Sequence, residues 1–138
     1  MRVLLVDDNQ AILTRAASVL TRDCVIVGTA SNGQAALDAA RSLAPDIIVL
    51  DICMPGMSGF EVAERLRAMK SKAAVVFLTV HADEEFVEAG RAAGGMGYVV
   101  KSRLTSDLMT ALLCARARRP FVSPAPDPSR RTRSFPGD

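Results

Sequence analysis

The segment PDIIVLDICMPGMSG, residues 45–59, carries the clearest indication of the protein's architecture. Its run Ile47–Leu50 has the length and the β-branched content of a strand. The run is apolar without alternation, which is typical of a strand covered on both faces, as in a parallel sheet. Asp51 follows the run, Gly56 marks a connection, and Ser58 is a candidate N-cap of the next helix. The stretch therefore predicts a buried parallel strand, a loop and a helix, in that order.

The same pattern extends to both sides of this stretch. Four further apolar runs have strand length: Val3–Val6, Val25–Ala30, Ala74–Leu78 and Met96–Val100. The segments between them carry apolar residues at helical spacing. Strand and helix patterns that alternate in this way predict an α/β fold, a (βα)5 doubly wound parallel sheet with right-handed crossovers.

Composition and charge divide the chain near Arg119. The 138 residues, of which 49% are hydrophobic, suffice for one domain with a single core, and we assign residues 1–119 to it. Residues 120–138 are rich in proline and arginine, and we expect them to form a disordered tail. Residues 1–115 carry 11 basic and 13 acidic side chains, whereas residues 116–138 carry six arginines and two aspartates. The basic pI of the whole chain therefore does not indicate a nucleic-acid-binding body.

Several protein classes are excluded. No stretch approaches the roughly 18 apolar residues of a membrane span, and the apolar run at the N-terminus is too short for a signal peptide. We therefore expect a cytoplasmic protein without membrane contact. Cys24, Cys53 and Cys114 are widely spaced and the chain has one histidine, so neither disulfides nor a zinc site are expected. A redox role for Cys53 is disfavoured, because nearby carboxylates raise the pKa of a thiol.

Polar side chains follow four of the predicted strands. Asp7 and Asp8 follow the first strand, Asp51 the third, Thr79 the fourth and Lys101 the fifth. Ligands of an open parallel sheet bind outside the carboxyl ends of its strands, so these groups should converge. Neighbouring carboxylates repel each other unless one is protonated or a hard cation such as Mg²⁺ binds. With a lysine and a hydroxyl added, the set can hold a dianionic group against a carboxylate, as in an aspartyl phosphate.

These motifs resemble the receiver domain of two-component response regulators, the CheY-like family. The resemblance is carried by Asp7-Asp8, by residues 49–59, by Leu78-Thr79-Val80 and by residues 97–102, in the usual order and spacing. It covers roughly residues 1–118. It implies a flavodoxin-like sheet with the strand order 2-1-3-4-5.

The resemblance also implies an acceptor and a metal site. Asp51 would be the phosphoacceptor, receiving phosphate from a sensor histidine kinase or a phosphotransfer protein. Asp8 and Asp51 would ligate Mg²⁺ (or Mn²⁺) together with the backbone carbonyl of Cys53, and Asp7 would act largely through water. Lys101 would pair with the phosphoryl group. Receivers assist only their own phosphorylation and dephosphorylation, so we expect a signalling phosphoacceptor and not an enzyme with an external substrate.

A switch is implied as well. Thr79 would move toward the phosphoryl group, and Tyr98 would then turn inward. This shift would remodel a face that binds a downstream protein target or a second copy of the chain. His81, next to this strand end, is interpreted as a polar loop residue that tunes water access to the site.

Two departures leave the biological setting open. Ser102 stands after Lys101 where many family members have proline. The ending also resembles the subfamily whose receivers are fused to a helix-turn-helix domain, and no such domain follows here. The chain is therefore either a receiver that acts by protein contact or the receiver part of a DNA-binding transcription regulator. Nucleic acid would then be bound through the absent output domain or, as a weaker alternative, through the basic tail.

Two further function classes fit the sequence poorly. A flavodoxin-like cofactor protein needs a first loop that cradles phosphate, whereas residues 7–10 (Asp-Asp-Asn-Gln) repel anions. A phosphohydrolase with an aspartate nucleophile needs a substrate pocket and usually a cap domain, for which 138 residues leave no room.

Overall fold

A parallel sheet runs through the middle of the protein in the order β2-β1-β3-β4-β5-β6. The structure, a computed structural model, describes residues 1–20, 23–81 and 83–123. The strands are β1 (Arg2–Val6), β2 (Val25–Ala30), β3 (Ile47–Asp51), β4 (Ala74–Thr79), β5 (Gly97–Val100) and β6 (Phe121–Val122). The predicted α/β fold with the order 2-1-3-4-5 is confirmed, and a sixth strand is added at the edge beside β5.

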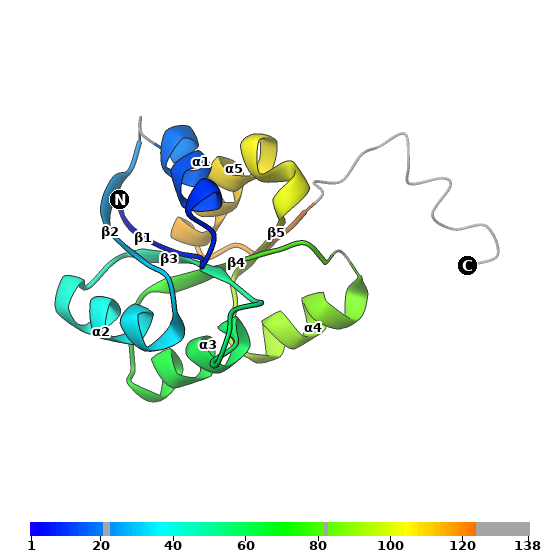
Figure 1. Cartoon of the computed structure of the whole chain (residues 1–138). Helices are drawn as coiled ribbons and strands as arrows, with labels where there is room; N and C mark the ends of the chain where they lie inside the picture. Colours follow the sequence, from blue (N-terminus) through cyan, green and yellow to red (C-terminus); the bar gives the residue numbers. More distant parts are fainter. Residues whose placement is uncertain (21–22, 82, 124–138) are drawn as a thin grey trace, which may run out of the picture.

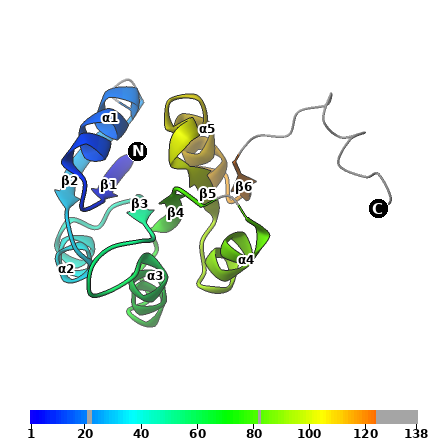
Figure 2. The same cartoon turned by 45° about the vertical axis from the view of Figure 1, so that its right-hand side comes forward.

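Helices cover both faces of the sheet. They are α1 (Gln10–Leu20), α2 (Gly33–Leu43), α3 (Gly59–Ala68), α4 (Glu84–Ala92), the 3-10 turn η1 (Lys101–Arg103) and α5 (Leu104–Arg116). Helices α1 and α5 lie on one face, and α2, α3 and α4 lie on the other (Figures 1 and 2). Within the described ranges, none of these helices has both the length and the apolar character that a membrane span requires.

Each face of the sheet has its own hydrophobic core. Neighbouring residues of a strand point to opposite faces, so Leu4 packs with α2 and α3 while Leu5 packs with α1 and α5. Both leucines are 1% exposed or less. This double burial is the reason that the strand sequences are continuously apolar, and it fixes the sheet edge at which the polar residues emerge.

The connection from β3 to α3 is tightly closed. The Ser58 side chain accepts a hydrogen bond from the Glu61 N–H at 3.2 Å, which confirms the predicted N-cap. The Gly59 N–H donates to the carbonyl of Ile52 at 2.8 Å. A Cβ atom at Gly59 would collide with the backbone carbonyl of Asp51 and lie 2.8 Å from the Cα of Ile52. The start of α3 thus rests directly on the backbone that carries Asp51.

The sixth strand lies beyond the predicted domain boundary. Phe121 and Val122 pair in parallel with Gly97 and Tyr98 of β5, and Ser123 is 2% exposed. The assignment of residues 120–123 to the tail is therefore wrong, because backbone pairing and the burial of Ser123 hold this segment on the sheet. The remainder of the predicted tail, residues 124–138, lies outside the described residues.

We predict that Gly59→Ala lowers the free energy of unfolding by about 2 kcal/mol, because backbone atoms cannot move aside as a side chain can. Gly28→Ala is the matched control, since its Cβ would meet only the ends of side chains, Leu43 Cδ1 at 2.8 Å and Leu4 Cδ1 at 3.6 Å. Urea denaturation of both variants checks this prediction. A loss at Gly59 no larger than the loss at Gly28 would contradict it.

Candidate functional site

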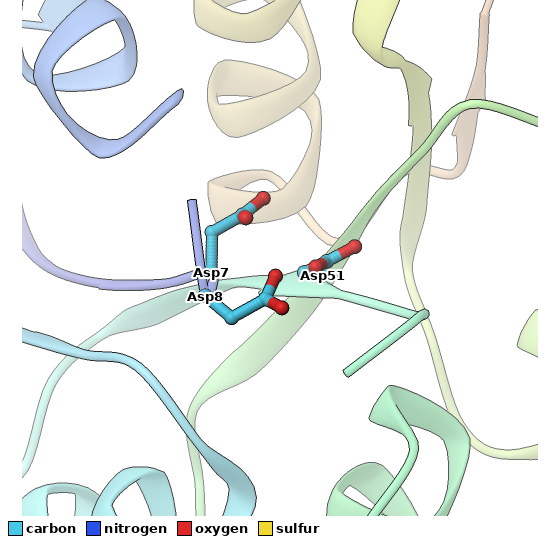
Figure 3. A group of neighbouring side chains, drawn as sticks. All are labelled: Asp7, Asp8 and Asp51. Carbon is cyan, nitrogen blue, oxygen red and sulfur yellow. The ribbon is translucent and has the colours of Figure 1, made fainter. Parts of the chain in front are cut away.

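Three carboxylates gather where β1 and β3 end (Figure 3). Val6 of β1 pairs with Leu50 of β3 in the parallel ladder. The next residues along the two strands, Asp7 and Asp51, therefore lie at the same level of the sheet. Asp7 and Asp51 are each 1% exposed, whereas Asp8 is exposed. One oxygen from each of the three residues lies within 4.8 Å of the others. The sequence reasoning placed these three residues at one edge, and the structure brings them together.

Lys101 reaches into this cluster from the start of η1, directly after β5, which lies two strands away from β3. Its Nζ atom lies 2.9 Å from Asp7 Oδ2 and 3.2 Å from Asp51 Oδ1. The Lys101 side chain is 16% exposed, so the contact is largely shielded from solvent. A single ammonium group therefore bridges two buried carboxylates.

Burial and the contacts with Lys101 shift the pKa values of the cluster in opposite directions. Burial raises the pKa of Asp51 to about 6, the negative charge of Asp7 adds to the rise, and Lys101 opposes it. Burial alone would lower the pKa of Lys101, but its contacts with Asp7 and Asp51 outweigh burial and raise it. The ammonium is thus held charged, while the Asp51 carboxylate is held in a costly ionised state at neutral pH.

One carboxylate oxygen of Asp51 has no hydrogen-bond partner among the described residues. Its Oδ1 accepts a hydrogen bond from the Cys53 N–H at 3.3 Å and contacts Lys101. Its Oδ2 is buried and has no hydrogen-bond partner in the described part of the chain. A buried oxygen without a donor is costly unless a ligand or cation reaches it. The donor set fits a hard divalent cation, because the oxygens are carboxylates and the exposed Asp8 leaves a side open for water ligands.

Thr79 lies between the acceptor strand and the lysine strand. It ends β4, whose neighbours pair Leu78 with Asp51 and Thr79 with Val100. The Thr79 side chain is buried, and its Oγ1 accepts a hydrogen bond from the His81 N–H at 3.1 Å. Thr79 thus connects the end of β4 to the His81 backbone.

Tyr98 lies inward in this structure. It is 3% exposed, and its hydroxyl donates to the carbonyl of His81 at 3.3 Å. Burial raises the pKa of Tyr98 to about 12, although a contact with Thr79 opposes the rise, so the hydroxyl stays protonated. The backbone of His81 thus contacts both Thr79 and Tyr98. This role could not be predicted from the sequence, because it uses main-chain atoms and not the imidazole, which lies against the Phe86 ring at 4.2 Å between ring centroids.

A hollow of about 1120 Å³ lies elsewhere, at the opposite end of the sheet. It is lined by the ends of α2, α3 and α5, including Arg41, Lys70 and Arg116, and by Asp46 before β3. Basic residues at helix C-termini compensate the helix dipoles, which accounts for them structurally. The chemistry-bearing carboxylates are not part of this hollow.

Comparison with known proteins agrees with the geometry. The family model of the response regulator receiver domain matches residues 3–113. The chain is 36% identical over 128 residues to the nitrate/nitrite response regulator protein NarL of Escherichia coli K12, covering 91% of this chain and 59% of NarL. It is 41% identical over 123 residues to the positive alginate biosynthesis regulatory protein of Pseudomonas aeruginosa, covering 87% of this chain and 48% of that protein.

Solved structures show the same likeness. A two-component response regulator of the LuxR family from Aurantimonas sp. SI85-9A1 superimposes with a TM-score of 0.85 at 30% identity, over 89% of each chain. The chain spans about half the length of the two curated relatives it matches. The matched residues 3–113 contain the three carboxylates, Thr79, Tyr98 and Lys101, and the chain belongs to the family of response regulator receiver domains of two-component systems.

Proposed function

We propose that Asp51 accepts a phosphoryl group from a sensor histidine kinase or a phosphotransfer protein, and that this switches a protein-interaction face. The observation that carries the proposal is the position of the Lys101 ammonium between Asp7 and Asp51 beside the buried, unpartnered Oδ2 of Asp51. A nucleophilic oxygen, a fixed positive charge and an opening for a cation then lie within one cluster.

Each residue has a distinct part in the transfer. The Asp51 carboxylate attacks phosphorus, and the bond from phosphorus to its donor breaks as the new P–O bond forms. Lys101 faces the incoming negative charge, and the Thr79 hydroxyl donates to a phosphoryl oxygen. Asp8 and Asp51, with the Cys53 carbonyl, would hold Mg²⁺ (or Mn²⁺), and Asp7 would act through water. Bound there, the cation neutralises charge on the carboxylates and on the phosphoryl oxygens.

The conformational change is then passed from the acceptor to the protein surface through Thr79 and Tyr98. The two side chains meet at the His81 backbone, so a shift of Thr79 toward phosphate would draw His81 with it and hold the Tyr98 hydroxyl inward. The elements α4, β5 and α5 surround this point and form the face that a downstream protein or a second copy of the chain would bind. Because the chemistry stops at the phosphorylated aspartate, we propose a signalling role and no turnover of an external substrate.

We predict that acetyl phosphate, a small phosphodonor, adds one phosphoryl group to the full chain in the presence of Mg²⁺. Chelation of the metal should abolish labelling, and so should Asp51→Asn, because the amide is not a nucleophile. Intact-protein mass spectrometry measures the product. Asp38→Asn is the matched control, since Asp38 is exposed on α2 and is not a member of the cluster, and this variant should label fully. Full labelling of Asp51→Asn would refute the assignment.

A second prediction concerns the pH dependence of stability without metal. The pKa of Asp51 is raised from 3.8 to about 6, so the native state binds more protons than the unfolded state between these values. Wild-type stability relative to Asp51→Asn should therefore fall as pH rises through this window. We expect the variant to be more stable by about 1–3 kcal/mol at pH 7.5, and the difference to vanish below pH 4. Urea denaturation in a chelator measures it, and a less stable variant at pH 7.5 would contradict the electrostatic account.

Regulation of transcription through DNA binding is the second candidate function, and the relatives favour it. The chain matches about half of each curated relative, and one match in Pseudomonas aeruginosa is named a putative transcriptional regulator. We propose that sequence-specific DNA binding, where it occurs, belongs to an output segment outside this chain. The 138-residue chain should then show no preference for a promoter fragment over random DNA in an electrophoretic mobility shift assay. A clear preference would place the readout within the chain itself.

A further inference from the structure

Asp107 is a buried acidic side chain outside the acidic cluster. It lies in α5, is 3% exposed, and accepts a hydrogen bond from Arg103 Nε at 2.8 Å. Two serine hydroxyls also donate to it, Ser106 at 3.3 Å and Ser123 at 2.6 Å. Burial pushes the pKa of Asp107 upward, but the hydrogen bonds from Arg103 and Ser123 and the charge of Arg103 outweigh burial and lower it. The carboxylate is therefore ionised and depends on these donors.

Ser123 uses this carboxylate to hold the last described strand. Its side chain donates to Asp107 Oδ2, and its N–H donates to the Tyr98 carbonyl at 2.8 Å. The Phe121 N–H donates to the Met96 carbonyl at 3.3 Å. A strand of two residues gains little from its ladder, since each net hydrogen bond is worth only about 1 kcal/mol. The charge-assisted bond from Ser123 to Asp107 is therefore the anchor of β6.

The anchor is connected to the phosphorylation site by two short routes. Arg103, the partner of Asp107, ends the 3-10 turn that Lys101 begins, and the Leu104 N–H donates to the Lys101 carbonyl. The second route runs through Tyr98. Its carbonyl accepts the Ser123 N–H, and its hydroxyl donates to His81, whose N–H binds Thr79. Lys101 and Thr79 thus each lead to the anchored segment through residues in direct contact.

A small hollow of about 210 Å³ separates α4 from β6. Val87 and Gly90 of α4 line one side, and Tyr98, Phe121 and Val122 line the other. Tyr98 and Val122 are partners in the ladder of β5 with β6 and both line this hollow, whereas Phe121 also packs against the core on the α5 face of the sheet. With Tyr98 inward, as here, β6 lies on β5; a ring turned out into the hollow would press against Val122.

We infer that residues 120–123 are a docking strand whose attachment to β5 depends on the state of Asp51, with the bond between Asp107 and Ser123 as its latch. The inference rests on the proposed function and deepens it. Phosphorylation holds Thr79 and Lys101 at the acceptor and Tyr98 inward, and this tightens the strand. The docked strand also covers the β5 edge against pairing with another chain, and it fixes where the chain leaves the sheet.

The latch is tested by amide hydrogen exchange of the full chain, followed by NMR. In Ser123→Ala, the protection of the amides of residues 121 and 123 should fall at least tenfold, while the protection of β1 and β3 is unchanged. Ser106→Ala is the matched control, because Ser106 also donates to Asp107 but is exposed and lies in α5, whereas Ser123 directly follows β6 and its N–H binds β5. Ser106→Ala should change the protection of the same two amides by less than twofold. Equal effects of the two variants, or none at Ser123→Ala, would overturn the latch.

The coupling is tested on the wild type with Mg²⁺ and beryllofluoride, a stable phosphoryl mimic, and separately with acetyl phosphate. Protection of the amides of Phe121 and Ser123 should rise at least threefold, and Asp51→Asn should show no rise. If mass spectrometry finds the phosphoryl group on the protein and protection is unchanged or lower, the inference fails while the proposed function stands. If no phosphoryl group is added, the proposed function is refuted, and the coupling that rests on it is refuted as well.

Discussion

The repulsion between two buried carboxylates, Asp7 and Asp51, is the constraint on which the site depends. Parallel pairing of β1 with β3 sets the two residues side by side at the sheet edge, and each is 1% exposed. Lys101 contacts both, yet one ammonium cannot neutralise two carboxylates, and Asp8 adds a third nearby. The cluster therefore keeps an excess of negative charge in a place where charge is costly, and binding of a cation relieves that cost.

The position of the lysine sets the remaining geometry. Because Lys101 follows β5 and Asp51 ends β3, the lysine side chain must cross the end of β4, where Thr79 lies. Thr79 therefore lies on the strand between acceptor and lysine. The His81 backbone contacts both Thr79 and Tyr98, so two hydrogen bonds connect the end of β4 with β5.

The sequence predicted the strand order through family resemblance and the acidic cluster through physical rules. Apolar runs without alternation mark strands buried on both faces, and strand ends of a parallel sheet share one edge, so Asp7, Asp51 and Lys101 could be placed together from position alone. Two features escaped this reasoning. Strand β6 has two apolar residues beside prolines, which give no periodic signal, and its anchor joins residues 16 positions apart. The role of His81 uses main-chain atoms, which any residue type supplies.

Asp51 and Asp107 show how the surroundings of a buried carboxylate decide whether its charge is satisfied. Both are nearly fully buried, and burial acts on both in the same direction. Asp107 is surrounded by an arginine and two serine hydroxyls, so its pKa lies below the ordinary value and its charge is satisfied. Asp51 has an oxygen without a donor and a second acid beside it, so its pKa rises to about 6. The satisfied acid can serve as a fixed anchor for β6, whereas the unsatisfied one gains most from a bond to an electrophile or a cation.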